Sequence, residues 1–224
     1  MDKYILIVAG GLGMRMNNNI PKQFIVLNKL PILMQTIKNI NKINSKFNII
    51  VVLPKEQITY WKDLITKYNF KINHKIIAGG KTRFNSVKNG LKEIPDNTLI
   101  AIHDGVRPII SEQLINTGFY LAEQKGNAIP YIDITESLRQ ITDKGNKIIN
   151  REKIKIIQTP QFFKSIDIKF AYQQRYKKKF TDDASVFETL NKKINLFYGL
   201  KQNIKITTPD DLKIAEFYLN KLKI

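Results

Sequence analysis

The chain has 224 residues, of which 43% are hydrophobic and 25% charged, and this fits one water-soluble domain with a full core. It contains no cysteine, which excludes disulfides, thiolate catalysis and cysteine-ligated zinc or iron–sulfur centres. Its 37 Lys and Arg residues outnumber 19 Asp and Glu residues, and the net charge of +18 admits a nucleic-acid-binding protein. Because Lys, Asn and Ile are abundant throughout, we favour a compositional bias and interpret most lysines as solvated surface.

Membrane and export signals are not evident in the sequence. No apolar run approaches the roughly 18 residues that a membrane span needs, so we expect no membrane association. The apolar start of the chain, at residues 3–8, is short and lacks a small-residue cleavage site, which favours a first β-strand over a signal peptide. These features predict a cytoplasmic protein.

Short apolar runs alternate with segments of helical period along the first half of the chain. The expected elements, in order, are a strand at 3–8, a helix from Pro31, a strand from Asn48, a helix from Gln57, a strand from His74, a helix over 83–94, a strand over 99–104 and a helix capped by Ser111 that ends near Glu123. The strands are continuously apolar, which indicates burial on both faces. The pattern predicts a three-layer α/β fold, in which helices cover both faces of a mostly parallel sheet.

The pattern changes between about residues 131 and 159. Two extended stretches flank a turn centred on Gly145, which predicts a protruding β-arm. Such an arm must bury its apolar residues elsewhere, and a second copy of the chain is the simplest partner, so we expect a homodimer. A last helix begins with Thr208 as N-cap and Pro209 at its first position. We interpret residues 1–224 as one domain with a dimerisation arm at about 131–159.

A glycine-rich loop follows the first strand directly and contains Ala9, Gly10, Gly11 and Gly13. Glycines let backbone amides approach phosphate oxygens closely, and Arg15 and Lys22 follow the loop as cations that can neutralise phosphate charge. The dinucleotide-binding fingerprint fails because Met16 stands where its third glycine belongs. The P-loop pattern also fails, since no Gly-Lys-Ser/Thr follows. A plain turn remains the alternative, and the two cations favour a phosphate-binding loop.

This loop resembles the signature of nucleotidyltransferases that activate sugars and polyols, through GLGMR at 11–15 and PKQ at 21–23. Five later blocks narrow the resemblance: GGKTRFNSVKNGL (79–91), HDGVRP (103–108), QTPQFF (158–163), TDDASVFE (181–188) and NIKITTPDDL (203–212). Their order is similar to that of the 2-C-methyl-D-erythritol 4-phosphate cytidylyltransferase family of isoprenoid biosynthesis. The resemblance implies a nucleotide-diphospho-sugar transferase-like fold. It also implies transfer of CMP from CTP to the acceptor phosphate, with release of pyrophosphate.

The resemblance further implies roles for residues on the nucleotide side. Arg15 and Lys22 match the catalytic pair that stabilises charge near the α-phosphorus and on the leaving pyrophosphate. The nucleotide-binding positions implied are Ala9, Gly10, Gly11, Gly13, Gly80, Arg83, Ser86 and Gly105. Gly105 stands where most relatives carry alanine, a change that we expect only to loosen the loop. The alternative for the turn at 79–86 is purely structural, with Asn85 or Ser86 as a helix cap.

On the acceptor side, the resemblance implies that Asp104 and Arg107 border the sugar phosphate and that Arg151 and Lys205 hold its phosphate. The resemblance also implies that Ser137 lies beside that phosphate. Thr135 is the alternative for this position, because a shift of two residues along a strand keeps the side chain on the same face. If the arm swaps across a dimer, Ser137 and Arg151 complete the partner's site.

A general base is not required, because a phosphate monoester has a second pKa near 6 and its oxygen is mostly deprotonated at neutral pH. We therefore interpret His103 as a buried structural histidine at a strand end rather than as a base. Magnesium is the expected cofactor, held largely by the CTP phosphates, with direct ligation by Asp104 as the alternative and no dedicated protein site.

Three other functions compete with this interpretation. Ribitol-5-phosphate cytidylyltransferase shares the GGKTR, HDGVRP and NIKIT blocks. A nucleotide-sugar glycosyltransferase would show an Asp-x-Asp motif, which is missing. A basic nucleic-acid-binding protein rests on charge alone, and we expect no specific nucleic-acid partner.

Overall fold

The computed structural model describes residues 1–11 and 20–222. Its main sheet has eight strands, in the order β10-β7-β11-β6-β1-β4-β5 with β12 beside β7. Their bounds are β1 (Lys3–Val8), β4 (Asn48–Leu53), β5 (Lys75–Ala78), β6 (Leu99–Asp104), β7 (Asn127–Asp133), β10 (Lys155–Ile157), β11 (Gln161–Lys164) and β12 (Leu196–Tyr198). Two small sheets pair β2 (Val26–Leu27) with β3 (Leu30–Pro31) and β8 (Leu138–Thr142) with β9 (Gly145–Ile149).

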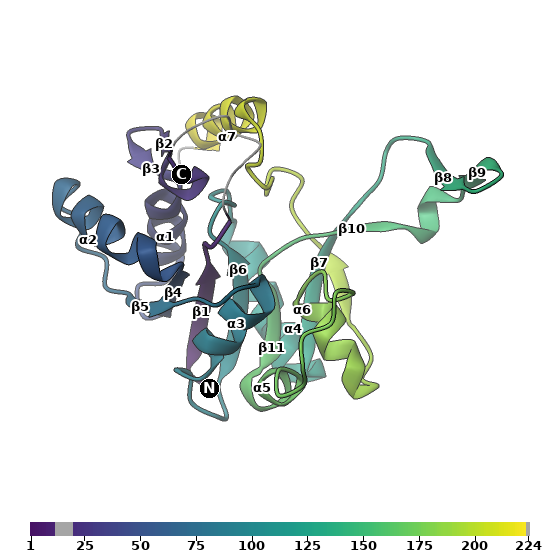
Figure 1. Cartoon of the computed structure of the whole chain (residues 1–224), viewed down its shortest axis with the longest axis horizontal. Helices are drawn as coiled ribbons and strands as arrows, with labels where there is room; N and C mark the ends of the chain where they lie inside the picture. Colours follow the sequence, from purple (N-terminus) through teal and green to yellow (C-terminus); the bar gives the residue numbers. More distant parts are fainter. Residues whose placement is uncertain (12–19, 223–224) are drawn as a thin grey trace.

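Helices lie on both sides of the main sheet (Figure 1). They are α1 (Ile32–Ile43), α2 (Ile58–Lys67), α3 (Arg83–Leu91), α4 (Glu112–Lys125), α5 (Ser165–Ala171), α6 (Asp183–Phe187) and α7 (Pro209–Leu222). Single 3-10 turns occur at Lys22–Phe24, Lys55–Gln57, Arg151–Lys153 and Glu188–Leu190. Among the described helices, none is long and apolar enough to cross a membrane.

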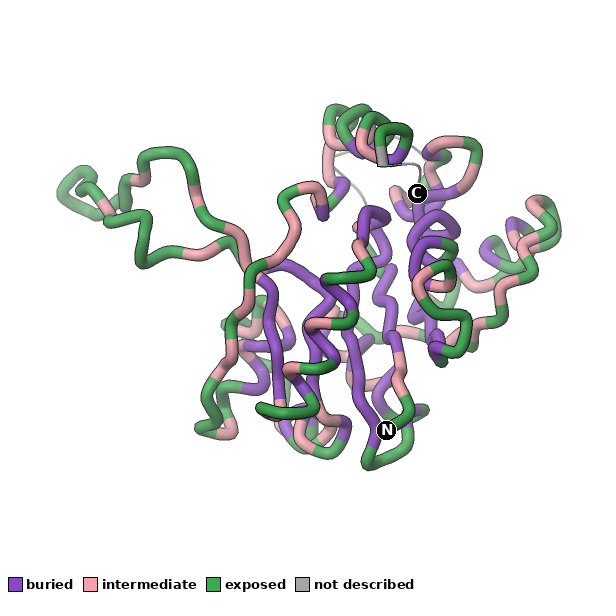
Figure 2. The backbone as a smooth tube through the Cα atoms, turned by 180° about the vertical axis from the view of Figure 1, so that it is seen from behind, coloured by how far each residue is buried: buried purple, intermediate pink, exposed green. Residues whose placement is uncertain are grey.

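The sheet is mostly parallel, as the continuous apolar strands predict. β1 runs parallel to both β4 and β6, and β4 runs parallel to β5. β11 enters between β6 and β7 and is antiparallel to both. The buried centre of the sheet is visible in Figure 2.

The alternation of side chains along β1 explains the three layers. Ile5 and Ile7 point into one core cluster together with residues of α1, α2 and α4. Leu6 and Val8 point into the opposite cluster together with residues of α3, α5 and α6. Because successive side chains of a strand face opposite sides, the four consecutive apolar residues at the end of β1 must be covered on both faces.

Two helix ends differ from the sequence prediction. α3 ends at Leu91 and not at Ile94, because the last residues form a turn and Pro95 cannot continue a helix. α4 extends two residues beyond Glu123 and ends at Lys125, and its C-cap is Gly126, whose φ of +87° suits the left-handed position that glycine adopts without strain. Its start is as predicted, since the Ser111 hydroxyl accepts a hydrogen bond from the Leu114 amide at 3.1 Å.

The segment over residues 131–159 extends away from the sheet. β7 and β10 pair in antiparallel fashion at its base, and β8 and β9 form the hairpin at its tip (Figure 1). Two isoleucines on this hairpin are largely exposed, Ile141 at 80% and Ile148 at 76%. The arm therefore presents apolar surface that the other described residues of its own chain do not cover.

Candidate active site

A cavity of about 280 Å³ opens at the carboxyl ends of β1, β4 and β6, next to the start of α3. In open α/β sheets, ligands bind at this edge. The cavity brings together nine of the residues singled out in the sequence, namely Ala9, Gly10, Gly11, Lys22, Gly80, Arg83, Ser86, Asp104 and Lys205. Gly13 and Arg15 lie outside the described residues.

Lys22 lies at the first position of a 3-10 turn and lines this cavity. Its side chain passes close to the glycine loop, since a Cβ on Gly11 would lie 3.2 Å from the Lys22 Cε atom. A glycine at position 11 therefore leaves room for the lysine beside the loop. The contact places an ammonium group next to the loop, as phosphate binding requires.

The turn before α3 is held by hydrogen bonds between backbone amides and side chains of the same segment. The Gly80 amide donates a hydrogen bond to the Ser86 Oγ at 3.1 Å, and a Cβ on Gly80 would lie only 2.5 Å from that of Asn85. Thr82 is the N-cap, since its hydroxyl accepts from the Asn85 amide at 3.2 Å. The expectation that Asn85 or Ser86 caps the helix is therefore wrong. Ser86 instead closes the turn that borders the cavity.

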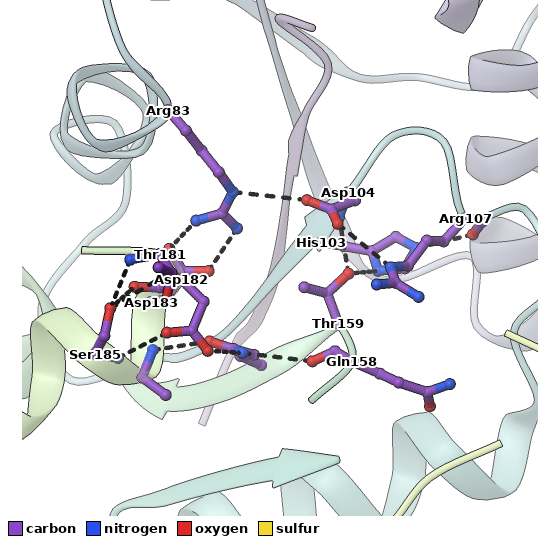
Figure 3. A network of polar contacts seen from close by, with 12 residues as sticks. Arg83, His103, Asp104, Arg107, Gln158, Thr159, Thr181, Asp182, Asp183 and Ser185 are labelled. Atoms are coloured by element: carbon purple, nitrogen blue, oxygen red, sulfur yellow. Dashed lines mark hydrogen bonds and ion pairs between the residues drawn. The ribbon is translucent and has the colours of Figure 1, made fainter. Parts of the chain in front are cut away.

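Asp104 lies at the end of β6 among three cations, of which Figure 3 shows Arg83 and Arg107. Lys205 Nζ lies 3.0 Å from Asp104 Oδ2, Arg107 Nε lies 3.3 Å from the same oxygen, and Arg83 Nε lies 3.6 Å from Oδ1. Burial alone would raise the pKa of Asp104, but the attraction of Arg83, Lys205 and Arg107 outweighs it and holds the pKa well below its usual range. Asp104 is consequently a carboxylate at any working pH.

A second cavity of about 290 Å³ adjoins the first and shares Arg83, Asp104 and Lys205 with it. Arg107 lines this second cavity and not the first, and its Nη1 donates to the Asn203 carbonyl at 2.8 Å. That bond connects the loop after β6 to the segment that carries Lys205. Two neighbouring cavities that meet at one carboxylate suit a reaction between two bound molecules.

His103 is fully buried behind Asp104. Its Nε2 lies 3.0 Å from the Arg107 carbonyl and its Nδ1 lies 3.1 Å from the Thr159 hydroxyl. Burial lowers the pKa of His103 to about 4, so the ring is neutral near pH 7. Both nitrogens are engaged, which supports the structural role predicted for this histidine.

Gly105 is buried under the loop and does not line the cavity. A Cβ at this position would lie 2.9 Å from the Ala9 Cβ and 3.0 Å from the Leu33 Cδ1. The looser loop that we expect from glycine at this position stays a prediction. Gly105 lets the strand end pack closely beneath Ala9, and its amide donates to the Val8 carbonyl at 2.9 Å.

Ser137 and Arg151 lie on the arm, and neither lines the two cavities of its own chain. Both residues are exposed, and Arg151 donates a hydrogen bond to the Thr135 carbonyl. Within one chain they are therefore separate from the other site residues.

Several residues that hold the site together have no role assigned to them in the sequence analysis. The Asp183 carboxylate accepts hydrogen bonds from both Nη atoms of Arg83, at 2.9 and 2.7 Å. The Thr159 hydroxyl accepts a hydrogen bond from the Asp104 amide at 3.1 Å. In the sequence analysis, the blocks at 158–163 and 181–188 served only to identify the family resemblance, and no residue in them was assigned a role. A contact between residues 100 positions apart has no local sequence signal.

The described residues offer few oxygen ligands to a magnesium ion. Among residues 1–11 and 20–222, no group of three His, Cys, Asp or Glu side chains could hold a metal ion. Asp104 is the carboxylate that both cavities share, and three cations already surround it. These residues fit a magnesium ion that takes most of its ligands from substrate phosphates, with at most one carboxylate from the protein.

Comparison with known proteins gives a consistent result. A family model for 2-C-methyl-D-erythritol 4-phosphate cytidylyltransferase matches residues 4–221. Two curated proteins of that name are similar along nearly their whole length. The one from Phocaeicola vulgatus is 46% identical over 96% of this chain and 99% of its own. The one from Azobacteroides pseudotrichonymphae is 49% identical over 96% and 97%.

Solved structures agree with the sequence relatives. The 4-diphosphocytidyl-2C-methyl-D-erythritol synthase from Anaerococcus prevotii is 28% identical and superposes with a TM-score of 0.81, covering 98% of each chain. The 2-C-methyl-D-erythritol 4-phosphate cytidylyltransferase from Francisella tularensis is 30% identical with a TM-score of 0.79, covering 97% and 99%. This chain belongs to the 2-C-methyl-D-erythritol 4-phosphate cytidylyltransferase family.

Proposed function

We propose that this chain transfers CMP from CTP to 2-C-methyl-D-erythritol 4-phosphate, forming 4-diphosphocytidyl-2-C-methyl-D-erythritol and pyrophosphate. Family membership supports the substrates. The observation that carries the proposal is the pair of cavities that meet at Asp104. One is bordered by the glycine loop and the α3 turn, and the other by Arg107 and the start of α6.

The reaction that we propose is an in-line displacement. An oxygen of the acceptor phosphate forms a bond to the α-phosphorus of CTP, and the bond from that phosphorus to the bridging oxygen of the β-phosphate breaks. The acceptor oxygen is mostly deprotonated at neutral pH, so alignment matters more than proton removal. When bound, magnesium supplies positive charge that neutralises the CTP phosphates.

The chain's own cations have separate tasks in this proposal. Lys22, with Arg15, would stabilise the charge that develops on the leaving pyrophosphate. Lys205 lies where the two cavities meet and would hold the acceptor phosphate. Asp104 would accept hydrogen bonds from acceptor hydroxyl groups, because its anionic form is strongly favoured.

We further propose that the protein is a homodimer in which the arm of one copy reaches the site of the other. The exposed isoleucines of the hairpin support this arrangement, since apolar surface of this kind is usually covered in an assembly. Ser137 and Arg151 would then border the partner's acceptor phosphate. We place the reaction in the cytoplasm, where CTP is available.

Phosphorus NMR tests the proposed reaction. Purified chain incubated with CTP, magnesium and the erythritol phosphate should give two coupled diphosphate signals of equal intensity, together with free pyrophosphate. Omitting the acceptor should abolish both products, and UTP in place of CTP should give little of either. Loss of the γ-phosphate alone, with orthophosphate as the product, would contradict the proposal.

A further inference from the structure

Asp183, the first residue of α6, carries a fully buried carboxylate that no step of the proposed reaction uses. Its Oδ1 accepts from Arg83 Nη1 at 2.9 Å and from the Tyr172 hydroxyl at 2.6 Å, and its Oδ2 accepts from Arg83 Nη2 at 2.7 Å. A buried charge is costly unless it is paired and hydrogen-bonded, and here both conditions are met. The carboxylate is thus a fixed anchor for one guanidinium.

The backbone that carries Asp183 is itself held in place. The Asp182 side chain accepts from the Ser185 amide at 2.9 Å and from Gln161 Nε2 at 2.8 Å. The Ala184 amide donates to Gln161 Oε1 at 2.9 Å. Gln161 belongs to β11, which pairs with β6. The start of α6 is therefore tied to the strand next to the one that ends in Asp104.

Arg83 connects Asp183 to Asp104, because its guanidinium contacts both carboxylates (Figure 3). With both Nη atoms on Asp183, the remaining donor atom, Nε, faces Asp104 Oδ1 at 3.6 Å. A guanidinium is planar and rigid, so a two-point contact on one edge fixes the direction of the other edge. The orientation of Arg83 beside Asp104 thus depends on Asp183.

We propose that Asp183 is a positioning residue for acceptor binding. It holds Arg83, and Arg83 in turn fixes the Asp104 carboxylate where the two cavities meet. The carboxylate is then oriented to receive the acceptor's hydroxyl groups. Arg83 lines both cavities, and we assign it this positioning role because Asp183 and Asp104 already pair with its guanidinium. The inference rests on the proposed function.

The direction in which the acceptor KM changes in Asp183→Asn distinguishes a positioning role from a purely electrostatic effect. Asp183→Asn removes a negative charge near the cavities, which on electrostatics alone would tighten the binding of an anionic acceptor. Positioning predicts the opposite result, because Arg83 loses its two-point contact and Asp104 loses its fixed neighbour. We expect the KM for the acceptor to rise about tenfold. The KM for CTP and kcat should stay within about twofold, since the lost contacts involve non-reacting groups.

Two further variants complete the experiment. Tyr172→Phe keeps the ion pair but removes one hydrogen bond to Asp183, so the acceptor KM should rise about threefold in a stably folded protein. Asp167→Asn is the matched control, because Asp167 is paired with Lys192 and lines neither of the two cavities. It should leave the acceptor KM unchanged. Melting temperatures identify any variant that does not fold.

The outcomes separate this inference from the proposed function. The inference is overturned if folded Asp183→Asn has an unchanged or lower acceptor KM, or if its KM for CTP rises equally. If Asp183→Asn does not fold, Tyr172→Phe decides, and an unchanged acceptor KM in that variant overturns it as well. A wild-type chain that transfers CMP to no acceptor would instead overturn the proposed function, and the inference with it.

Discussion

Turnover should depend directly on the charge of Lys22, which lines the cavity beside the glycine loop. Replacing Lys22 by Ala removes an ammonium from the cavity that would receive the CTP phosphates. We expect kcat to fall by about 10² to 10³, comparable to the loss of one strong oxyanion donor. Arg15→Ala should behave alike. Lys62→Ala, an exposed lysine of α2 with the same charge change, is the control. A normal kcat in Lys22→Ala would contradict a catalytic role for Lys22.

His103 should make the stability of the fold depend on pH. Its pKa is about 4 in the folded chain and 6.5 in the unfolded chain, so between these values the unfolded chain binds the extra proton. The free energy of unfolding should therefore fall as pH decreases through this window. From about pH 7 to 4.5 the loss attributable to His103 is on the order of 2 kcal/mol.

Urea unfolding at a series of pH values measures this effect. His103→Gln carries no titrating ring, so its free energy of unfolding should fall less steeply over the same range. His74 also has a lowered pKa from burial, and it contributes equally to both proteins. Identical pH slopes for the two proteins would show that His103 does not bind a proton on unfolding.

At the scale of single residues, the sequence could assign chemistry but not partners. Lys205 and Asp104 were both predicted to border the acceptor, and they lie 3.0 Å apart. Arg83 was assigned to the nucleotide side, yet its guanidinium is bonded to Asp183, which the sequence did not single out. Such a pairing depends on how α3 and α6 pack, and no local pattern encodes it.

Among the elements, the arm is the one whose function depends on a second chain. Ile141→Asp combined with Ile148→Asp places charges on its exposed apolar face. If the arm contacts a partner, burying these charges is unfavourable, so the variant should sediment as a monomer and lose most activity. Ile166→Asp, an exposed isoleucine on α5, is the control. A fully active monomer would contradict the proposal that the arm completes the partner's site.

Helices and strands with a clear hydrophobic pattern could be predicted from the sequence, and very short strands could not. The strand over Leu99–Asp104 and the N-cap of α4 are found where the sequence places them. β11 and β12 are four and three residues long, too short for any period to be read. Their positions come from tertiary pairing with β7 and β6. The sequence therefore predicted the parallel centre of the sheet and not the places of β11 and β12.

For the molecule as a whole, the net charge of +18 should act on association rates. Both proposed substrates are anions, and attraction by a basic protein is screened as ionic strength rises. We expect kcat/KM to fall roughly tenfold between about 0.01 and 0.5 M salt, while kcat changes little. A kcat/KM that is insensitive to salt would show that the charge has no part in substrate capture.

The same charge was the basis of the nucleic-acid alternative. A gel-shift titration with duplex and single-stranded DNA should give weak retention that is independent of sequence and disappears with added salt. Tight binding to one sequence at moderate salt would instead favour a dedicated nucleic-acid surface.

The central claim is that the two cavities bind CTP and an erythritol phosphate for cytidylyl transfer. Its most direct test is pyrophosphate release with CTP and magnesium, comparing 2-C-methyl-D-erythritol 4-phosphate, ribitol 5-phosphate and no acceptor. We predict release with the erythritol compound only. Release with ribitol 5-phosphate alone would keep the mechanism and change the substrate, and no release with either acceptor from a folded dimer would contradict the claim.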